Sequence, residues 1–484
     1  MGLTPPRLLG QGVTTADDDA DNPYLSEDFK AAFKEMLTLA KQGNVSARYK
    51  LAQMYDEGKG IPQNQATAVS WYTKAAKKGH AKAQTNLGLM YYKGIGVTQD
   101  FSAALKWYTK AAEQGHAEAQ AALGYFLFYM PRRFLDRPVG YFIDKKQGLK
   151  WLNLATNQGH DIAQQVIGDM YYMGIGVTQD FSAAFKWLTK AAEQGNISAQ
   201  FKLGCMYYQN HGLDVPQSNK SAFKWFTEAA EQRNGQTEAD RSFNPDADLM
   251  WVQAKAQYFL ASLYYFGEGT SVNFKAAVKW YTKSAEQNHV DSQNRLGDIF
   301  KYNVGGLKNK KAAVKWYTLA AEQGYSNAQY ELGCMYEEGE GCLKDGRTAE
   351  MWYTKAAEQN HVNSQYNLGC MYDEGSGILK NCKTAIKWYT KAAGNGDFRS
   401  RYCLGIMYQE TNGIPVDNLR AYMWFNLANL DYESFLHWDD PKEKMDELAT
   451  KMTPGDVSKA QIMSKNYLEW GLIDEAKHNF KVIW

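Results

Sequence analysis

The sequence predicts an all-α fold, a solenoid of stacked helix pairs. Two apolar stripes with helical spacing alternate with glycine-rich breaks along most of the chain. A tryptophan also recurs at one position of this repeating unit, and most of its spacings are 36 residues: Trp71, Trp107, Trp151, Trp187, Trp225, Trp280, Trp316, Trp352, Trp388 and Trp424. A fixed period in this range is typical of a stacked array whose core grows with each copy.

The first helix of the unit is clearest in the copy that runs from His80 to Gly115. Its apolar residues fall on one helical face: Ala83, Leu87, Met90 and Tyr91. Gly88 lies on the same stripe and recurs in most copies, so we expect it to let a neighbouring helix approach closely. The run Gly94-Ile95-Gly96 then ends the helix.

The second helix of the unit begins after Asp100, a suitable N-cap residue. Its apolar stripe consists of Ala104, Trp107, Tyr108, Ala111 and Ala112. Gly115 suits the left-handed residue just past the helix end, and Asn288 and Asn360 replace it in two other copies. We interpret the tryptophan as a side chain that fills the seam between helices.

The repeat pattern divides the chain into four parts. Ten copies begin near Asn44, His80, His116, His160, Asn196, Gln253, His289, Tyr325, His361 and Asp397. The predicted organisation is a disordered segment at 1–23, a half-repeat helix at 24–43, ten repeats at 44–431 with insertions near 131–146 and 234–252, and a helical cap at 432–484. The insertions are either loops near a binding surface or neutral surface growth.

The composition excludes several partner classes. A net charge of +1 and a pI near 7.5 give no overall bias toward nucleic acid. No segment approaches the roughly 18 consecutive apolar residues of a membrane helix, so we expect no membrane insertion. The N-terminus lacks the apolar core of a signal peptide. The expected location is therefore the cytoplasm, or outside the cell without a recognisable signal.

The unit resembles the Sel1-like repeat, a relative of the tetratricopeptide repeat, in its bacterial form. The matching residues read A-Q-x-x-L-G-x-M-Y, then G-x-G-V-x-Q-D, then A-A-x-K-W-Y-x-K-A-A-E-Q-G, and the match covers residues 29–431. The resemblance implies a right-handed superhelical α-solenoid of antiparallel helix pairs. It also implies an adaptor that brings other proteins together.

The cysteines depart from one branch of that family, whose secreted members join their repeats with disulfides. The corresponding positions here hold Ala111-Ala112 and Ala119-Gln120. Cys334 and Cys370 occupy equivalent places in adjacent repeats, about 10 Å apart at normal helix spacing, beyond the reach of a disulfide. We expect all six cysteines to be reduced thiols, as in the cytoplasm.

Three motifs that could carry chemistry have simpler interpretations. The histidines that open repeats lie too far apart to share one metal ion, which favours turn and capping roles: His80, His116, His160, His289 and His361. Gly94-Ile-Gly96 lacks the third glycine of a dinucleotide fingerprint. Ser221 and Lys224 fit the S-x-x-K motif of penicillin-recognising enzymes, without its companion motifs. We therefore predict no catalytic residue, no metal and no small-molecule cofactor.

One position of the first helix, the residue after the Met-Tyr pair, varies among the copies. It reads Asp56, Tyr92, Phe128, Tyr172, Tyr208, Tyr265, Lys301, Glu337, Asp373 and Gln409. Repeats two to six thus present an aromatic row, and repeats eight and nine present acids, with Glu338 and Glu374 beside them. Because first helices line the concave side in the family, we predict a groove for a peptide with apolar anchors and a basic flank. The alternative is that the row packs against the neighbouring repeat.

These patterns predict a noncatalytic scaffold or adaptor that binds a protein or peptide segment in its concave groove. One alternative is a secreted bacterial effector that uses the same groove on host proteins. Another is a hydrolase of β-lactam or cell-wall compounds, which would need a nucleophile and base that the sequence does not display. The predicted partner is a protein or peptide, with no nucleic acid and no membrane insertion.

Overall fold

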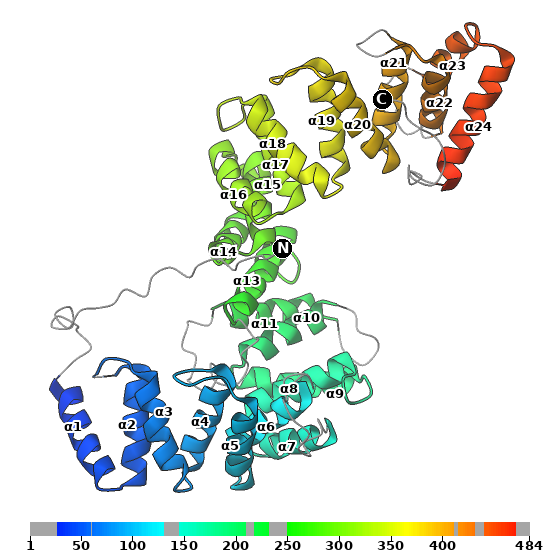
Figure 1. The fold of residues 1–484 in the computed structure, drawn as a ribbon. Helices are drawn as coiled ribbons and strands as arrows, with labels where there is room; N and C mark the ends of the chain where they lie inside the picture. Colours follow the sequence, from blue (N-terminus) through cyan, green and yellow to red (C-terminus); the bar gives the residue numbers. More distant parts are fainter. Residues whose placement is uncertain are drawn as a thin grey trace. The chain divides into compact units, whose positions relative to one another are not determined.

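The computed structural model describes residues 27–59, 61–129, 145–209, 217–231, 249–410, 415–430 and 440–470. Within these residues every regular element is a helix, and consecutive helices pack as antiparallel pairs (Figure 1). The predicted all-α solenoid of helix pairs is therefore confirmed. The first half of the series comprises α1 (Glu27–Lys41), α2 (Val45–Glu57), α3 (Gln65–Ala76), α4 (Ala81–Lys93), α5 (Phe101–Glu113), α6 (Ala117–Tyr129), α7 (Lys145–Asn157), α8 (Asp161–Met173), α9 (Phe181–Glu193), α10 (Ile197–Tyr208) and α11 (Asn219–Glu231).

The second half of the series continues the same alternation. It comprises α13 (Leu249–Phe266), α14 (Phe274–Glu286), α15 (Val290–Lys301), the 3-10 helix η3 (Val304–Gly306), α16 (Lys310–Glu322), α17 (Ser326–Glu338), α18 (Gly346–Glu358), α19 (Val362–Glu374), α20 (Cys382–Gly394), α21 (Phe398–Gln409), α22 (Asn418–Asn429), α23 (Pro441–Ala449) and α24 (Pro454–Trp470). The first helix of each repeat is called the A helix below, and the second the B helix. α15, α17, α19 and α21 are thus A helices, and α16, α18, α20 and α22 are B helices.

The chain forms two compact units. Unit 1 consists of Met1–Ala256 with Glu268–Thr270, and unit 2 consists of Gln257–Gly267 with Ser271–Trp484. Within unit 1, α6 contacts α8, and within unit 2, α15 contacts α17 and α19 contacts α21. A helices of successive repeats therefore touch one another as well as their own B helices, as expected for the inner side of a curved stack.

The recurring glycine of the A helix lies directly against an aromatic ring of its B helix. A Cβ atom on Gly369 would lie 2.4 Å from the ring of Tyr389, and one on Gly333 would lie 2.6 Å from Tyr353. Such distances leave no room for any side chain, so only glycine allows the two helices to pack at this separation. The close approach predicted for this glycine is confirmed.

The tryptophan fills the seam only in part. Trp280 to Trp424 of the unit 2 repeats are buried, whereas Trp71 and its unit 1 equivalents are half-buried. A lysine one turn further along often covers the exposed indole face, as Lys74 Nζ does 3.8 Å from the ring centre of Trp71. The fully buried side chain is the residue that follows the tryptophan, such as Tyr72 or Tyr317.

The histidines that open A helices are N-caps, as predicted. His80 Nδ1 accepts a hydrogen bond from the Ala83 backbone N–H at 3.2 Å, and His361 Nδ1 accepts one from Ser364 at the same distance. Asn196 caps α10 in the same way. Because the cap nitrogen must accept a hydrogen bond through its lone pair, the cap forms only with the neutral imidazole.

A buried glutamine on the A helix joins three helices. Gln329 Nε2 donates to the Ala321 carbonyl at the end of α16, 3.0 Å away, and Gln329 Oε1 accepts from Gln359 Nε2 at the end of α18, 2.8 Å away. Both bonds recur at Gln84, Gln120, Gln293 and Gln365. Each bridge gives a carbonyl at a helix end a second donor, beside a backbone N–H, and ties one repeat to the next.

The ends and insertions are described only in part. The segment predicted as disordered, 1–23, lies outside the described residues, as do most positions of the two predicted insertions. Within the segment 432–484 the structure describes α23 and α24, and Tyr467 of α24 contacts Trp424 of α22 edge-on at 5.1 Å. We propose that α23 and α24 cover the last apolar face of the array.

We expect Gln329→Leu to lower the free energy of unfolding by about 1–3 kcal/mol, because it removes two hydrogen bonds between helices, one to the Ala321 carbonyl and one from Gln359. Urea unfolding of the full chain measures this change. Gln461→Leu, on the exposed side of α24, is the control and should change it by less than about 0.5 kcal/mol. Equal midpoints for Gln329→Leu and the wild type would rule out a stabilising bridge.

The histidine caps predict a loss of stability on mild acidification. Burial lowers the pKa of His80, His116 and His160, so the folded chain takes up protons less readily than the unfolded chain. The free energy of unfolding therefore falls as the pH drops below about 6.5. Replacing these three histidines with asparagine should reduce this dependence between about pH 7.5 and 5.5, as followed by thermal unfolding. An unchanged pH dependence would contradict the capping account.

Candidate functional site

The predicted aromatic row packs largely against its own repeats. The ring of Tyr92 meets Phe101 of the following B helix edge-on at 5.7 Å, and Tyr172 and Tyr265 meet Phe181 and Phe274 at 5.5 Å and 5.4 Å. Tyr208 is half-buried, and Phe128 is only 4% exposed. Tyr92 also meets Phe126 of the next repeat at 6.0 Å. The row therefore has partners within the array, mostly in its own repeats and not in the neighbouring repeat that the alternative named.

The predicted acidic residues lie on the last turns of two A helices, α17 and α19. Glu337 accepts a hydrogen bond from Tyr353 Oη at 2.7 Å, and Asp373 lies 3.7 Å from Lys380 Nζ. Burial raises the pKa of Asp373. Glu338 and Glu374 are exposed, so they are the two acids of this group that are most open to a partner.

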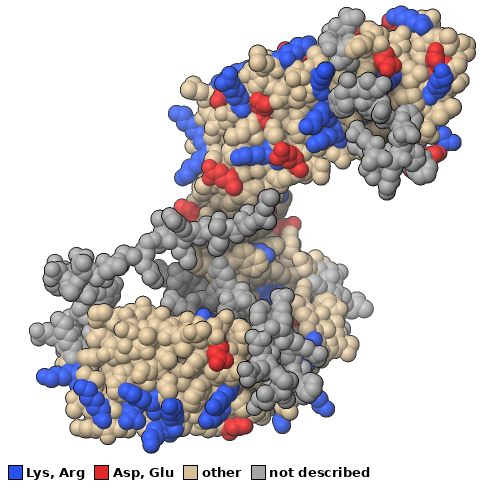
Figure 2. Space-filling view, viewed as in Figure 1, with Lys and Arg blue, Asp and Glu red and all other residues tan. Residues whose placement is uncertain are grey.

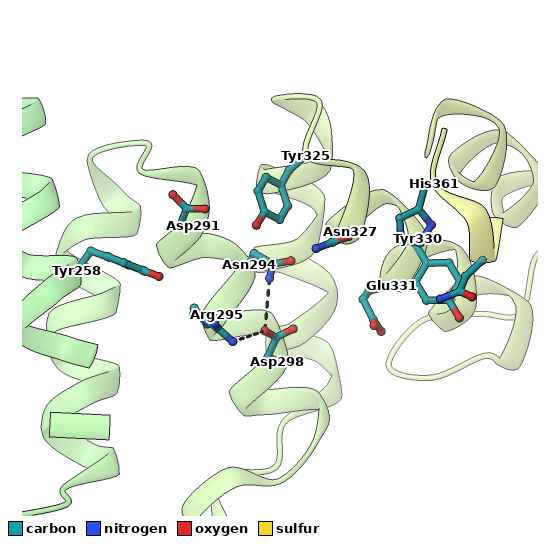
Figure 3. Close-up of a pocket in the computed structure, with 11 residues that line it drawn as sticks. Tyr258, Asp291, Asn294, Arg295, Asp298, Tyr325, Asn327, Tyr330, Glu331 and His361 are labelled. Atoms are coloured by element: carbon teal, nitrogen blue, oxygen red, sulfur yellow. Dashed lines mark hydrogen bonds and ion pairs between the residues drawn. The ribbon is translucent and has the colours of Figure 1, made fainter. Parts of the chain in front are cut away.

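A polar hollow of about 340 Å³ lies on the A helices of unit 2 (Figure 3). α13, α15 and α17 supply most of its walls, and α19 closes one side. The residues that line it are Tyr258, Asp291, Asn294, Arg295, Asp298, Tyr325, Asn327, Tyr330, Glu331, His361 and Asn363. Its volume is at the lower end of the range for small-ligand sites, and its lining is more polar than is usual for them.

The hollow lies where one repeat departs from a pattern. In neighbouring repeats a tyrosine of the A helix lies against the cap histidine of the next repeat, as Tyr258 does with His289 at 5.1 Å and Tyr330 with His361 at 4.8 Å. At the corresponding places α15 has Asn294 and the next cap is Tyr325. A short side chain thus replaces a ring on the A helix, and the hollow lies at this position.

The carboxylates of the hollow are already hydrogen bonded. Asp298 Oδ1 accepts from Tyr317 Oη at 2.8 Å, and its other oxygen accepts from Asn294 Nδ2 at 3.3 Å. Glu331 lies 2.6 Å from Lys301 Nζ and accepts from Tyr302 Oη at 3.0 Å. Burial raises the pKa of the Asp298 carboxyl, against the opposing effect of the Tyr317 hydrogen bond.

The lining nevertheless has a negative formal charge. Asp291, Asp298 and Glu331 carry one negative charge each, and Arg295 carries the one positive charge, which gives a sum of −2. On the face drawn in Figure 2, acidic and basic side chains are mixed over α15 to α20, whereas basic side chains gather along the edge of unit 1 near α1 to α5. The net negative charge of the lining makes the hollow a poor site for an anion.

The sequence did not predict this site, because the prediction rested on a different position of the A helix, the residue after the Met-Tyr pair. The hollow is lined by positions two, five, six and nine after the cap, which also vary among the copies, whereas the aromatic row occupies position twelve. The signal was the interrupted tyrosine row at position five, which reads Tyr258, Asn294, Tyr330, Tyr366 and Tyr402 in successive repeats.

The S-x-x-K pair shows no activated nucleophile. Ser221 and Lys224 lie on α11, and Lys224 Nζ lies 4.8 Å from the ring centre of Trp225. The Ser221 backbone N–H donates to Ser218 Oγ at 3.2 Å, an ordinary contact at a helix start. Both residues thus have the structural roles of their equivalents in other repeats.

All six cysteines are free, half-buried thiols, as predicted. Tyr353 Oη donates to Cys334 Sγ at 3.2 Å, and Tyr389 Oη donates to Cys370 Sγ at 3.4 Å. Burial raises the pKa of both thiols. They are therefore protonated at neutral pH and poor nucleophiles.

Stacked helix pairs with a polar lining on the A helices define a helical repeat protein of the solenoid class. Within that class, the Sel1 repeat family model matches residues 45–80, 81–116, 117–160, 162–196, 197–234, 254–289, 290–325, 326–361, 362–397 and 400–429. The chain therefore belongs to the Sel1 repeat family, whose members are generally scaffolds for protein interactions.

The chain is also similar to solved structures, and the first of the two described next supports this assignment. A protective antigen of uropathogenic Escherichia coli strains, with an SLR fold, is 30% identical with a TM-score of 0.55, over 90% of this chain and 94% of that chain. A Sel1 repeat protein from Oxalobacter formigenes is 24% identical with a TM-score of 0.40, over 78% and 92% of the two chains. A comparison with curated proteins found no match.

The described helices also bear on membrane association. None of them combines the length and the apolar character that a membrane span requires. This agrees with the absence of a long apolar run from the sequence.

We expect Tyr317→Phe to destabilise the chain by about 1–2 kcal/mol, because it removes the hydrogen bond to a partly buried carboxylate. Tyr389→Phe is the matched control, since its hydroxyl meets thiols, Cys370 and Cys403, which are weak acceptors, and it should cost less than about 1 kcal/mol. Urea unfolding compares the two variants. If Tyr389→Phe costs as much as Tyr317→Phe, the Asp298 bond has no special importance.

Proposed function

We propose that this chain is a noncatalytic scaffold that holds a protein or peptide segment along the A helices of unit 2. The observation that carries the proposal is the hollow, which is formed by positions that vary among repeats on an otherwise repeated framework. Positions that maintain the array stay constant because packing requires them, so the variable positions are free to serve a partner.

The exposed acids at the ends of α17 and α19 favour a partner with a basic flank. Glu338 and Glu374 are exposed on neighbouring A helices of the same unit, one repeat apart. Exposed acids on a binding surface contribute mainly to the association rate and to the choice of partner. The apolar anchors expected from the aromatic row receive less support, because those rings contact their own repeats.

Site-specific photocrosslinking in the native cell tests the proposal. A benzophenone side chain at Asn327, on the A-helix side, should crosslink a partner. The same group at Lys315, an exposed position of the B helix α16, should give no equivalent product. Equal crosslinking from both positions would contradict binding along the A helices.

Charge reversal then tests the acidic flank of the scaffold, which consists of Glu338 and Glu374. We expect Glu338→Lys with Glu374→Lys to reduce the crosslinking yield at Asn327 about tenfold. Glu322→Lys with Glu358→Lys is the matched control, because both residues are exposed on B helices and the change in net charge is identical. Glu337 and Asp373 are left unchanged because their hydrogen bond and ion pair support the fold. An equal effect of the two double variants would argue against a specific flank.

A further inference from the structure

The floor of the hollow contains a buried hydrogen-bond acceptor that has no donor. Asn294 is 9% exposed, and its Nδ2 donates to Asp298 Oδ2 at 3.3 Å. Its Oδ1 atom is shielded from water and has no hydrogen-bond partner among the described residues. The free protein thus already bears the cost of removing this oxygen from water, so an incoming donor gains more here than at an exposed oxygen.

Unused donors lie beside this acceptor. The Arg295 side chain is 51% exposed; it hydrogen bonds to Tyr258 and lies 3.6 Å from Asp298 Oδ2. A guanidinium carries five N–H donors, so several remain for an acceptor in the hollow. Asn327 is exposed on the same lining, on the side of the hollow toward which the Asn294 amide is drawn (Figure 3). Its amide can both donate and accept.

The charges of the lining limit which chemical groups can bind in the hollow. An anion is disfavoured by the formal charge of −2. A simple cation would find carboxylates that already have partners: Tyr317 for Asp298, Lys301 for Glu331, and Tyr325 for Asp291. The groups that can still form hydrogen bonds are the buried acceptor Asn294 Oδ1 and the donors of Arg295 and Asn327. They complement a neutral group that both donates and accepts a hydrogen bond. The peptide bond is the commonest such group in a protein partner.

We propose that the hollow binds backbone amides of an extended peptide segment. Asn294 Oδ1 accepts a peptide N–H after a small rotation of its amide, a torsion that is soft in asparagine. Arg295 donates to a peptide carbonyl, and Asn327 bonds the neighbouring peptide group. This inference rests on the proposed function and deepens it, because it states which part of the partner is recognised. Recognition through the backbone leaves the partner's side chains free to vary, and the acidic flank adds the preference for basic residues.

The test begins with 12-residue random peptides displayed on phage and selected on the full chain. Fluorescence polarisation then gives the dissociation constant of the strongest selected peptide. We expect Asn294→Ala and Arg295→Gln each to weaken binding about tenfold. Gln165→Ala is the matched control, because Gln165 makes the same amide-to-aspartate hydrogen bond, with Asp169, on the A helix α8 of unit 1. It should change the dissociation constant less than twofold.

N-methylation of the peptide identifies the backbone contact itself. Each amide of the selected peptide is methylated in turn, which removes one N–H donor and leaves the side chains in place. At least one N-methyl peptide should bind the wild-type chain about tenfold more weakly than the parent peptide, with no further loss on Asn294→Ala. If every N-methyl peptide loses as much affinity for the variant as for the wild type, Asn294 does not accept a backbone N–H and the inference is overturned.

The same measurements separate this inference from the proposed function. Peptides that respond to Glu338→Lys with Glu374→Lys, but not to Asn294→Ala or Arg295→Gln, would overturn backbone recognition and leave the scaffold proposal standing. Peptides that respond to neither set, or a selection that enriches none, would overturn both. Thermal unfolding of Asn294→Ala and Arg295→Gln confirms that a loss of binding does not come from a loss of folding.

Discussion

The array depends on the buried glutamine that links each A helix to two B helices. Gln329 satisfies a carbonyl at the end of the preceding B helix and accepts a hydrogen bond from Gln359 at the end of its own. Helix ends leave backbone groups unsatisfied, and a stacked array buries many such ends. The bridge adds a side-chain donor to one carbonyl at such an end, beside the backbone N–H that the carbonyl already accepts, and ties successive repeats together.

The glycine contact complements the bridge. The glutamine sets the distance between repeats, and Gly369 against the ring of Tyr389 sets the distance within one. These positions, with the caps and the alanines, occupy the faces of the helices that point into the array. The remaining A-helix positions vary in residue type among the repeats, although some of them, such as Tyr92, also contact other rings of the array. This separation explains how one repeat can form a hollow while its backbone matches that of its neighbours.

The fold was predictable because the sequence features that determine it recur in many repeats. A 36-residue period, the glycine on the A-helix stripe and the cap histidines each occur many times, so chance matches are averaged out. The site was not predictable in the same way, since several positions vary and periodicity does not say which of them face solvent. Tyr92 illustrates the difficulty: the A helix directs its ring outward, but Phe101 of the following helix meets it. The hollow forms because Asn294 stands where the adjacent repeats have a tyrosine ring. This difference is visible in the sequence only when Asn294 is compared with the equivalent residues Tyr258 and Tyr330.

The hollow also coincides with two local departures from good packing. Tyr325 opens α17 without the side-chain cap bond that His361 and its equivalents make, and Asn294 Oδ1 lies buried without a donor. Histidine and tyrosine at these two places would avoid both, and adjacent repeats have them. Other buried polar atoms without a hydrogen-bond partner occur elsewhere in the described residues, for example Tyr467 Oη, but at this hollow such an atom coincides with a helix start that has no side-chain cap. Proteins commonly accept such losses where a ligand supplies the missing interaction. The two exceptions therefore support binding at this hollow more strongly than the aromatic row does, because the row already has its partners within the fold.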